Sequence, residues 1–229
     1  MTTPLPDDAY YNWDVMVNAL AAQKPQWEPG TRHGYHALTY GHLIGEMVRR
    51  VSGQSFGKYF DEKIAKPLNL DFWIGLPDEQ FDKVTDIQPS LFPAWTKFVG
   101  PLLKLIPNSL LRGDLAMVKD FGNPATIAGS AFNNPRMEME NPFYANSREW
   151  RKAEIPAANG HGSARAIAKF YGVLSNGGSR DGVHVLKPET IDLARQTESQ
   201  GNDLVLGNLE TRFGLGFMLG TKHISMGPA

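Results

Sequence analysis

The sequence predicts a domain of mixed α/β (α+β) class in which helices outnumber strands. Apolar residues recur at intervals of three and four over several stretches, whereas extended segments are indicated only at 72–74 and 213–219. The chain has 229 residues, of which 41% are hydrophobic, and this is enough for a sizeable core. With 21% charged residues it is also too apolar for a disordered chain. We therefore expect one domain over 1–229.

The first helix is expected to start after Asn12, a good N-terminal capping residue. Its apolar residues follow helical spacing: Trp13, Met16, Val17 and Leu20. A break at 24–31, which contains two prolines and a glycine, ends this pattern.

A second helix is predicted over 39–52 with one buried apolar face. Arg49 and Arg50 occupy its last turn, where cations suit the helix dipole, and Gly53 is placed to terminate it. The residues expected to be buried are Leu43, Ile44, Met47, Val48 and Val51.

Ser55 is a candidate cap for a third helix, which Pro67 stops. Phe56, Phe60 and Ile64 are four residues apart and would share one face of that helix.

The stretch 77–156 is expected to be an irregular, insertion-like lobe because it contains nine prolines. Short helices are predicted around 95–105 and 109–119. Two interpretations remain equally open: a lobe on the substrate side, or a surface excursion without a role.

Regular patterns return at Ser163, which is a candidate cap for a helix ending at Gly177-Gly178. The side chains expected on its apolar side are Ile167, Phe170, Tyr171 and Leu174. Another helix is predicted to begin at Pro188, since proline suits the first turn. Large apolar residues alternate with smaller ones over 213–219, which is typical of a strand.

Composition excludes several classes of function. The net charge is −1 and the pI about 6.6, so neither nucleic acid nor an anionic membrane is an expected partner. The absence of cysteine excludes disulfides, thiolate nucleophiles and cysteine-bound metals. The start of the chain lacks a basic end followed by an apolar stretch, so a soluble, cytoplasmic protein is expected.

Neither a metal nor a cofactor is expected. His33, His36 and His42 lie close in sequence, but no glutamate sits between two histidines at the spacing of a zinc-binding helix. The glycine pattern that starts at Gly160 has Arg165 in place of its third glycine, which disfavours a nucleotide site.

One order of motifs resembles a known family. The chain is similar to the serine hydrolases related to class C β-lactamases, including the esterases that share their fold. The motifs that carry this resemblance are Pro-Gly-Thr-Arg-His-Gly-Tyr-His-Ala (29–37), Gly-Glu (45–46), Ser-Gly-Gln-Ser-Phe (52–56), Lys-Pro-Leu-Asn-Leu (66–70), Asn-Gly-His-Gly-Ser-Ala-Arg (159–165), Phe-Tyr (170–171), Leu-Ser-Asn-Gly-Gly (174–178), Lys-Pro-Glu-Thr (187–190) and Phe-Gly-Leu-Gly-Phe (213–217). The resemblance implies a β-lactamase/transpeptidase-like fold, of which this chain supplies mainly the helical lobe with part of the sheet.

The resemblance also implies a catalytic tyrosine from a Tyr-x-Asn motif, which falls here on Tyr35-His36-Ala37. A phenol ionises only near pH 10, so it acts as a base only where neighbouring cations favour the phenolate. Tyr35 is thus the catalytic candidate, with His36 and Ala37 as candidate pocket residues. Ala37 removes the amide of the motif, which favours ester hydrolysis over β-lactam turnover. The alternative for Tyr35 is an aromatic packed at the mouth of a helix.

The nucleophile that the resemblance implies, a serine in Ser-x-x-Lys, does not appear before Tyr35. The chain's one such motif, Ser55 to Lys58, follows Tyr35, whereas in the family it precedes the tyrosine. We interpret Ser55 as a helix cap and Lys58 as a solvated side chain. The last family motif is also absent, so the domain resembles a family member that lacks its first and last segments.

His161 completes the candidate pocket residues, with a loop histidine packed on the following helix as the alternative. The functional hypothesis is a serine hydrolase that acts on a small-molecule ester or β-lactam through an acyl-enzyme. Two alternatives stay open: a non-catalytic member that binds a ligand or peptide, and a non-functional fragment. The sequence makes no prediction of the oligomeric state.

Overall fold

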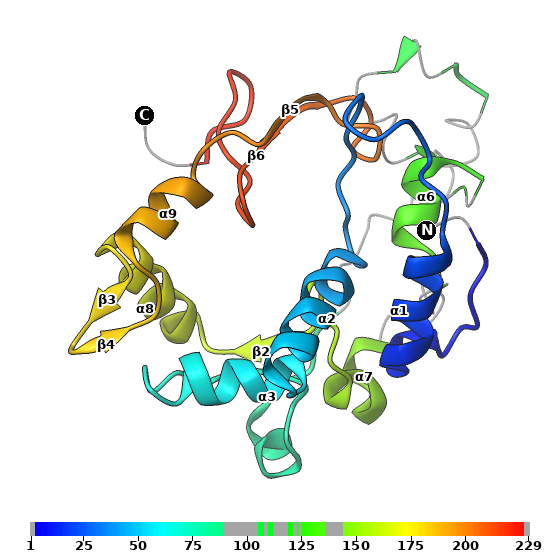
Figure 1. The fold of residues 1–229 in the computed structure, drawn as a ribbon. Coiled ribbons are helices and arrows are strands. Elements are labelled where there is room, and N and C mark those ends of the chain that lie inside the picture. Colours follow the sequence, from blue (N-terminus) through cyan, green and yellow to red (C-terminus); the bar gives the residue numbers. More distant parts are fainter. Residues whose placement is uncertain are drawn as a thin grey trace.

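The computed structural model describes residues 3–88, 105–107, 110–111, 119–120, 123, 125–135 and 144–226. These residues form helices and three separate two-stranded antiparallel ribbons, arranged around an open centre in Figure 1. The mixed α/β prediction is confirmed. The helices are α1 (Trp13–Ala22), α2 (Tyr40–Ser52), α3 (Phe56–Phe60), α6 (Ile127–Phe132), α7 (Arg148–Lys152), α8 (Ala164–Ser175) and α9 (Pro188–Ala194).

The ribbons pair β1 with β2, β3 with β4 and β5 with β6. The strands are β1 (Phe72–Ile74), β2 (Gly160–Gly162), β3 (Ser179–Arg180), β4 (Val183–His184), β5 (Ser199–Asn202) and β6 (Glu210–Phe213). A π-helical turn over Asp61–Ala65 extends α3, and 3₁₀ turns span Ala9–Tyr11, Asp78–Lys83 and Tyr144–Asn146. Within the described residues, no helix combines the length and the hydropathy needed to cross a bilayer.

The junction of α1 and α2 follows from local capping and one buried glutamate. The side chain of Asn12 accepts a hydrogen bond from the Val15 N–H, which confirms the predicted cap. The indole of Trp13 donates to Glu46 at 2.9 Å, and Arg49 and Arg50 also bind that carboxylate. Hydrogen bonds from Arg49, Arg50 and Trp13 lower the pKa of Glu46 to about 2.

The apolar face of α2 is exposed, so the prediction of a buried face over 39–52 is wrong. Met47 is 63% exposed and Val51 is 91% exposed, and Leu43 and Ile44 are exposed as well. The helix instead packs through His42, Glu46 and its glycines. A Cβ on Gly45 would lie 2.5 Å from the Trp13 ring, so the missing side chain is what lets α1 approach. No described element covers the apolar stripe.

Ser55 caps α3, as the sequence predicted. Its Oγ accepts from the Lys58 N–H and donates to Glu154 Oε1 at 2.6 Å. Lys58 is exposed, which agrees with a solvated side chain. Glu154 Oε2 accepts from the Gly57 N–H, so one carboxylate joins the start of α3 to the end of α7.

Replacing Ser55 with alanine is expected to lower the free energy of unfolding by about 1–2 kcal/mol, because the cap and the bond to Glu154 are lost together. Urea unfolding followed by circular dichroism measures this cost. Ser175→Ala is the matched control, since that hydroxyl is exposed and bonds only within its own helix. Equal stability of the two variants would contradict the capping role.

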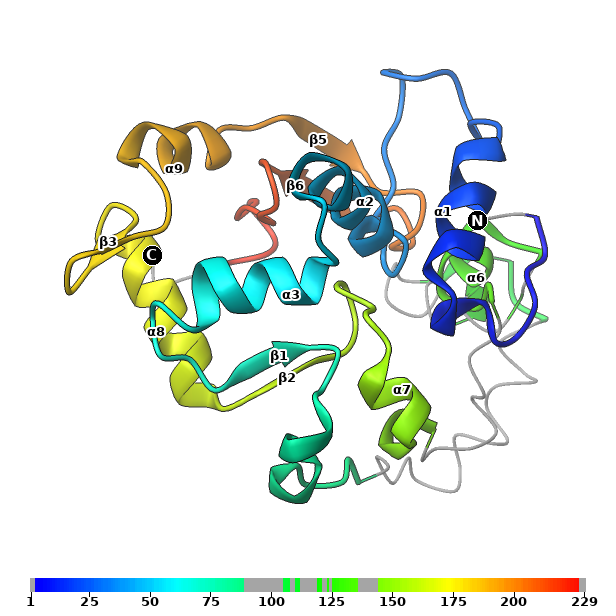
Figure 2. The ribbon, with the colours of Figure 1, turned by 60° about the horizontal axis from the view of Figure 1, so that its bottom comes forward.

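The predicted extended segment at 72–74 is β1, and its partner β2 lies almost 90 residues away in the chain. Trp73 faces His161 across this ribbon. Figure 2 shows α3 running along β1 and β2. The partner strand escaped prediction because its three residues, Gly-His-Gly, have no strand propensity of their own.

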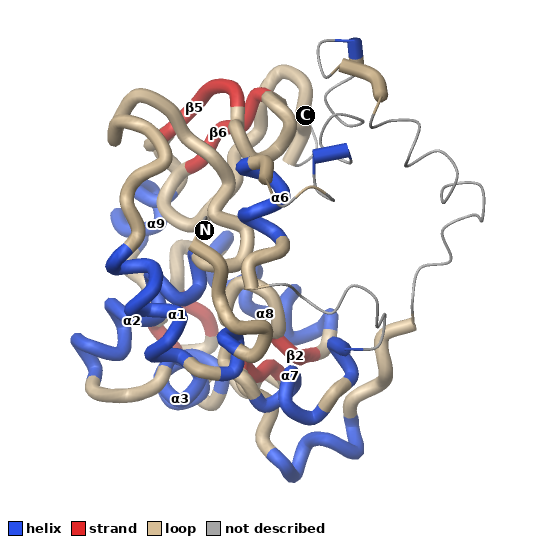
Figure 3. The backbone as a smooth tube through the Cα atoms, turned by 90° about the vertical axis from the view of Figure 1, so that its right-hand side faces the viewer, coloured by secondary structure: helices blue, strands red, loops and turns tan. Residues whose placement is uncertain are grey.

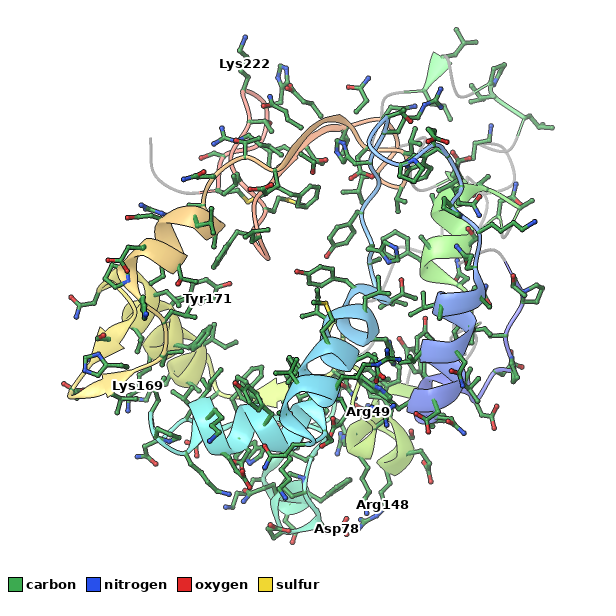
Figure 4. The ribbon with its side chains drawn as sticks, in the orientation of Figure 1. Arg49, Asp78, Arg148, Lys169, Tyr171 and Lys222 are labelled. Atoms are coloured by element: carbon green, nitrogen blue, oxygen red, sulfur yellow. The ribbon has the colours of Figure 1, made fainter. Side chains whose placement is uncertain are left out.

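Helix α8 starts at its predicted cap, where the Ser163 side chain accepts from the Ala166 N–H. The predicted apolar side is only partly correct: Leu174 is buried, but Ile167 and Tyr171 are exposed. Figure 4 places Tyr171 on the side of α8 that faces the open centre, with Lys169 on the outer side. Helix α9 begins with Pro188 in its first turn, as expected.

The prediction of a strand over 213–219 is wrong. Strand β6 ends at Phe213, and the chain then folds back, with Gly214 N–H bonded to the Phe217 carbonyl. Gly216 has φ +79°, a left-handed conformation that glycine permits and that ends an extended segment. The alternation of large and small residues here belongs to a tight turn.

Within 77–156 the described residues include two helices that the sequence did not indicate, α6 and α7. They are capped by Thr126 and Ser147. The helices predicted around 95–105 and 109–119 lie almost wholly outside the described residues. Asp78 binds Arg148 and Lys152, which fixes α7 on the 3₁₀ turn Asp78–Lys83, and Figure 4 shows Arg148 and Asp78 side by side.

One hydrophobic core joins this stretch to the candidate tyrosine segment. Trp150 packs edge-on against Tyr10 and Tyr144, and Ile155 is fully buried. The members of this core are Ala9, Tyr10, Met16, Ala37, Leu38, Trp150 and Ile155. The irregular stretch thus supplies core residues, and it anchors the chain immediately after Tyr35.

Candidate functional site

A pocket of about 410 Å³ lies between the segment 33–40 and the β5–β6 ribbon. It contains three of the four predicted site residues, and aromatic and small residues make up most of its wall. The lining residues are His33, Gly34, Tyr35, His36, Ala37, Tyr40, Ala157, Ser199, Phe213, Gly214, Gly216, Phe217 and Met218.

Tyr35 is held in the wall by both its backbone and its ring. Its N–H donates to Asp203 Oδ1 at 3.1 Å, and its ring stacks on Phe213 with 6.1 Å between centroids and 11° between planes. Tyr35 is 38% exposed and lines the pocket. Tyr35 is thus packed through its ring on Phe213 and partly exposed in the pocket.

His36 and Ala37 continue the wall into α2. His36 Nδ1 lies 2.5 Å from the Thr39 hydroxyl, at the residue that precedes the helix. Ala37 is buried in the core beside Leu38. The wall of the pocket is therefore apolar at this position.

The structure does not bring His161 to this pocket. It lies in β2 opposite Trp73, and burial of its imidazole lowers its pKa. Strand β2 and the β5–β6 ribbon are at opposite ends of the molecule in Figure 3. The pocket wall thus contains no contribution from His161.

The wall lacks the cations that a tyrosine base requires. None of the described lining residues is lysine or arginine. Ser55 and Lys58 are not among them either, and Ser55 is engaged with Glu154. The described residues also contain no cluster of three metal-binding side chains. The polar chemistry available in the described wall is that of two phenols (Tyr35 and Tyr40), two imidazoles and the Ser199 hydroxyl.

Sequence reasoning missed half of the pocket. Apart from Ala157, the missed residues outside the segment 33–40 come from β5, from β6 and from the turn after Phe213, and these follow Tyr35 by more than 160 residues. The predicted strand at 213–219 was the available signal, but it did not indicate that this segment faces Tyr35.

Comparison with known proteins identifies the relatives of the chain. The family model described as Beta-lactamase matches residues 1–227. The curated protein Esterase/beta-lactamase LipL from Mycobacterium tuberculosis is 31% identical over an alignment of 181 residues, which covers 77% of this chain and 37% of LipL.

Three solved structures share the fold over nearly the whole chain. A novel penicillin-binding protein homolog from Caulobacter crescentus is 33% identical with a TM-score of 0.74 and covers 100% of this chain. A family VIII carboxylesterase is 32% identical with a TM-score of 0.73 and covers 96%. EstA from Arthrobacter nitroguajacolicus Rue61a is 25% identical with a TM-score of 0.76 and covers 99%.

The chain is shorter than each of these relatives. It spans 37% of the curated relative and between 51% and 55% of the three solved chains.

Proposed function

The chain belongs to the Beta-lactamase family, and we propose that it forms part of a serine hydrolase that cleaves small carboxylic esters through an acyl-enzyme. We propose further that residues 1–229 make up one incomplete domain of the β-lactamase/transpeptidase-like fold. The observation that carries the proposal is the pocket in which Tyr35 is exposed beside the small, apolar Ala37.

The proposed reaction begins at a serine supplied by polypeptide outside these residues. The Tyr35 phenolate accepts the serine proton while the serine oxygen bonds to the ester carbonyl carbon. Tyr35 then returns this proton to the alcohol oxygen, and the alcohol leaves. Water attacks the acyl-enzyme in the same manner, which releases the carboxylic acid and restores the serine. Cations that favour the phenolate must also come from outside the described wall.

Two features support an ester as substrate. Ala37 leaves the pocket without the motif's amide, so an amide-rich β-lactam loses one partner. The printed names of the relatives point the same way, since they include an esterase, a carboxylesterase and EstA.

A second candidate function, a non-catalytic member of the family that binds a small ligand, is favoured by one observation. Neither a Ser-x-x-Lys motif before Tyr35 nor a cation in the described wall is present. Joining the chain to a polypeptide segment that carries Ser-x-x-Lys and measuring ester hydrolysis distinguishes the two functions, because only the hydrolase requires this segment.

Labelling the 229-residue chain with a fluorophosphonate probe is expected to give no stoichiometric adduct, because the described wall lacks an activated serine. Intact-mass spectrometry measures labelling, and p-nitrophenyl butyrate hydrolysis is followed in parallel. Ser55→Ala and Ser199→Ala are the matched variants. An adduct that disappears in either variant would show that the chain has its own nucleophile and would contradict the proposal of an external serine.

A further inference from the structure

A buried carboxylate lies directly behind the Tyr35 wall of the pocket. Asp203 follows β5 and is 0% exposed. Its Oδ1 accepts hydrogen bonds from the backbone N–H groups of Tyr35, Val205 and Leu206, at 3.1, 2.8 and 3.0 Å. Three backbone donors compensate the cost of burying this charge.

These bonds connect two segments that are distant in sequence. Val205 and Leu206 belong to the same turn as Asp203, whereas Tyr35 lies 168 residues away. The Leu204 N–H also donates to the carbonyl of His33 at 3.2 Å. The turn after β5 is therefore hydrogen-bonded to the two residues that flank Gly34, namely His33 and Tyr35.

The second oxygen of Asp203 starts a chain of hydrogen bonds to His33. The buried Thr211 hydroxyl lies 3.2 Å from Asp203 Oδ2 and 2.8 Å from His33 Nε2. A carboxylate only accepts, so Thr211 donates to Asp203 and accepts from His33 Nε2–H. In the neutral imidazole this order fixes one tautomer of His33 and leaves its Nδ1 as a hydrogen-bond acceptor.

Asp203 thus starts two branches of hydrogen bonds, one to the Tyr35 backbone and one through Thr211 to His33, and both residues contact the same aromatic ring. The His33 ring lies edge-on to Phe213, with 6.1 Å between centroids, and the Tyr35 ring stacks on Phe213 at the same separation. His33, Tyr35 and Phe213 all line the pocket. Asp203 is thus hydrogen-bonded to the Tyr35 backbone directly and to the His33 imidazole through Thr211.

We propose that Asp203 is a positioning residue that fixes the Tyr35 backbone through one carboxylate oxygen and the His33 tautomer through Thr211 and the other. A phenol and an imidazole of defined tautomer are thereby held in one pocket. That this arrangement serves ester cleavage rests on the proposed function.

Nuclear magnetic resonance of the 229-residue chain tests each branch. Asp203→Ala is expected to speed hydrogen exchange at the Tyr35 amide by about tenfold or more, because Asp203 is its hydrogen-bond acceptor. Amides within α8 are expected to exchange at unchanged rates. Asp192→Ala is the matched control, since Asp192 is an exposed carboxylate on α9.

Thr211→Val tests the second branch without removing the carboxylate. It is expected to abolish the single Nε2–H signature of His33 in ¹H–¹⁵N correlation spectra, while protection of the Tyr35 amide persists. Loss of packing alone does not select a histidine tautomer. If Asp203→Ala fails to fold, this variant decides the result.

Unchanged exchange at Tyr35 in folded Asp203→Ala, or an unchanged His33 tautomer in Thr211→Val, would overturn the positioning role. These readouts need no ester and no turnover. Failure of the proposed function would be seen in a different result, namely normal ester turnover after Tyr35→Phe. That result would leave the exchange and tautomer findings unchanged.

Discussion

Replacing Tyr35 with phenylalanine is expected to lower the kcat for ester hydrolysis by about 100-fold or more, because general-base catalysis contributes about 10²–10⁴ to a rate. The ring of phenylalanine keeps the stacking on Phe213, so folding is expected to be preserved. The measurement is p-nitrophenyl butyrate turnover by the polypeptide that joins these residues to a Ser-x-x-Lys segment, together with the melting temperature.

Tyr171→Phe provides the control for this variant. Tyr171 is also an exposed tyrosine, but it lies on α8 and is not among the described lining residues of the pocket. A kcat within about twofold of the unmodified protein is expected for the control. Near-normal turnover of Tyr35→Phe would remove Tyr35 from the mechanism.

Acidification is expected to destabilise the fold by about 3 kcal/mol between pH 6.5 and pH 4, because of His42. This imidazole is 0% exposed, and burial lowers its pKa from 6.5 to about 4. Below pH 6.5 the unfolded chain binds a proton at His42 that the folded chain does not bind until about pH 4. The unfolded state therefore gains stability as the pH falls through this window.

Urea unfolding at pH 7, 5.5 and 4 measures this loss. His42→Leu is expected to reduce the dependence on pH, since leucine has no proton to bind. Burial also lowers the pKa of His36 and His161, so a smaller dependence on pH remains. His223→Gln is the control, because His223 is exposed near the end of the described chain. Parallel pH profiles for His42→Leu and the unmodified chain would refute the assignment to His42.

Local signals account for the parts of the fold that were predicted. Asn12, Ser55 and Ser163 cap their helices as expected, and Gly53 ends α2 in the left-handed conformation, with φ +70°. Each of these signals depends on a side chain and on backbone groups within three or four residues. Such short-range interactions can be predicted from the sequence because they do not depend on the tertiary structure.

The burial of individual side chains was predicted less well, because it depends on which other elements pack against the helix. The apolar stripe of α2 has the spacing of a buried face, yet Met47 and Val51 are exposed, and the packed face contains His42 and Glu46. Periodicity shows that one side of a helix is apolar, but only the neighbouring elements decide which side is covered.

For the candidate site, the sequence alone determined the family resemblance, the Tyr35 segment and the missing Ser-x-x-Lys motif before it. Only the tertiary structure decided that the turn after β5 and the residues after Phe213 complete the pocket, that Asp203 lies behind Tyr35, and that His161 lies elsewhere. The physical reason is distance along the chain. Hydrogen bonds and ring stacking between residues more than 160 positions apart leave no local pattern, since each partner is also compatible with an ordinary loop or core position.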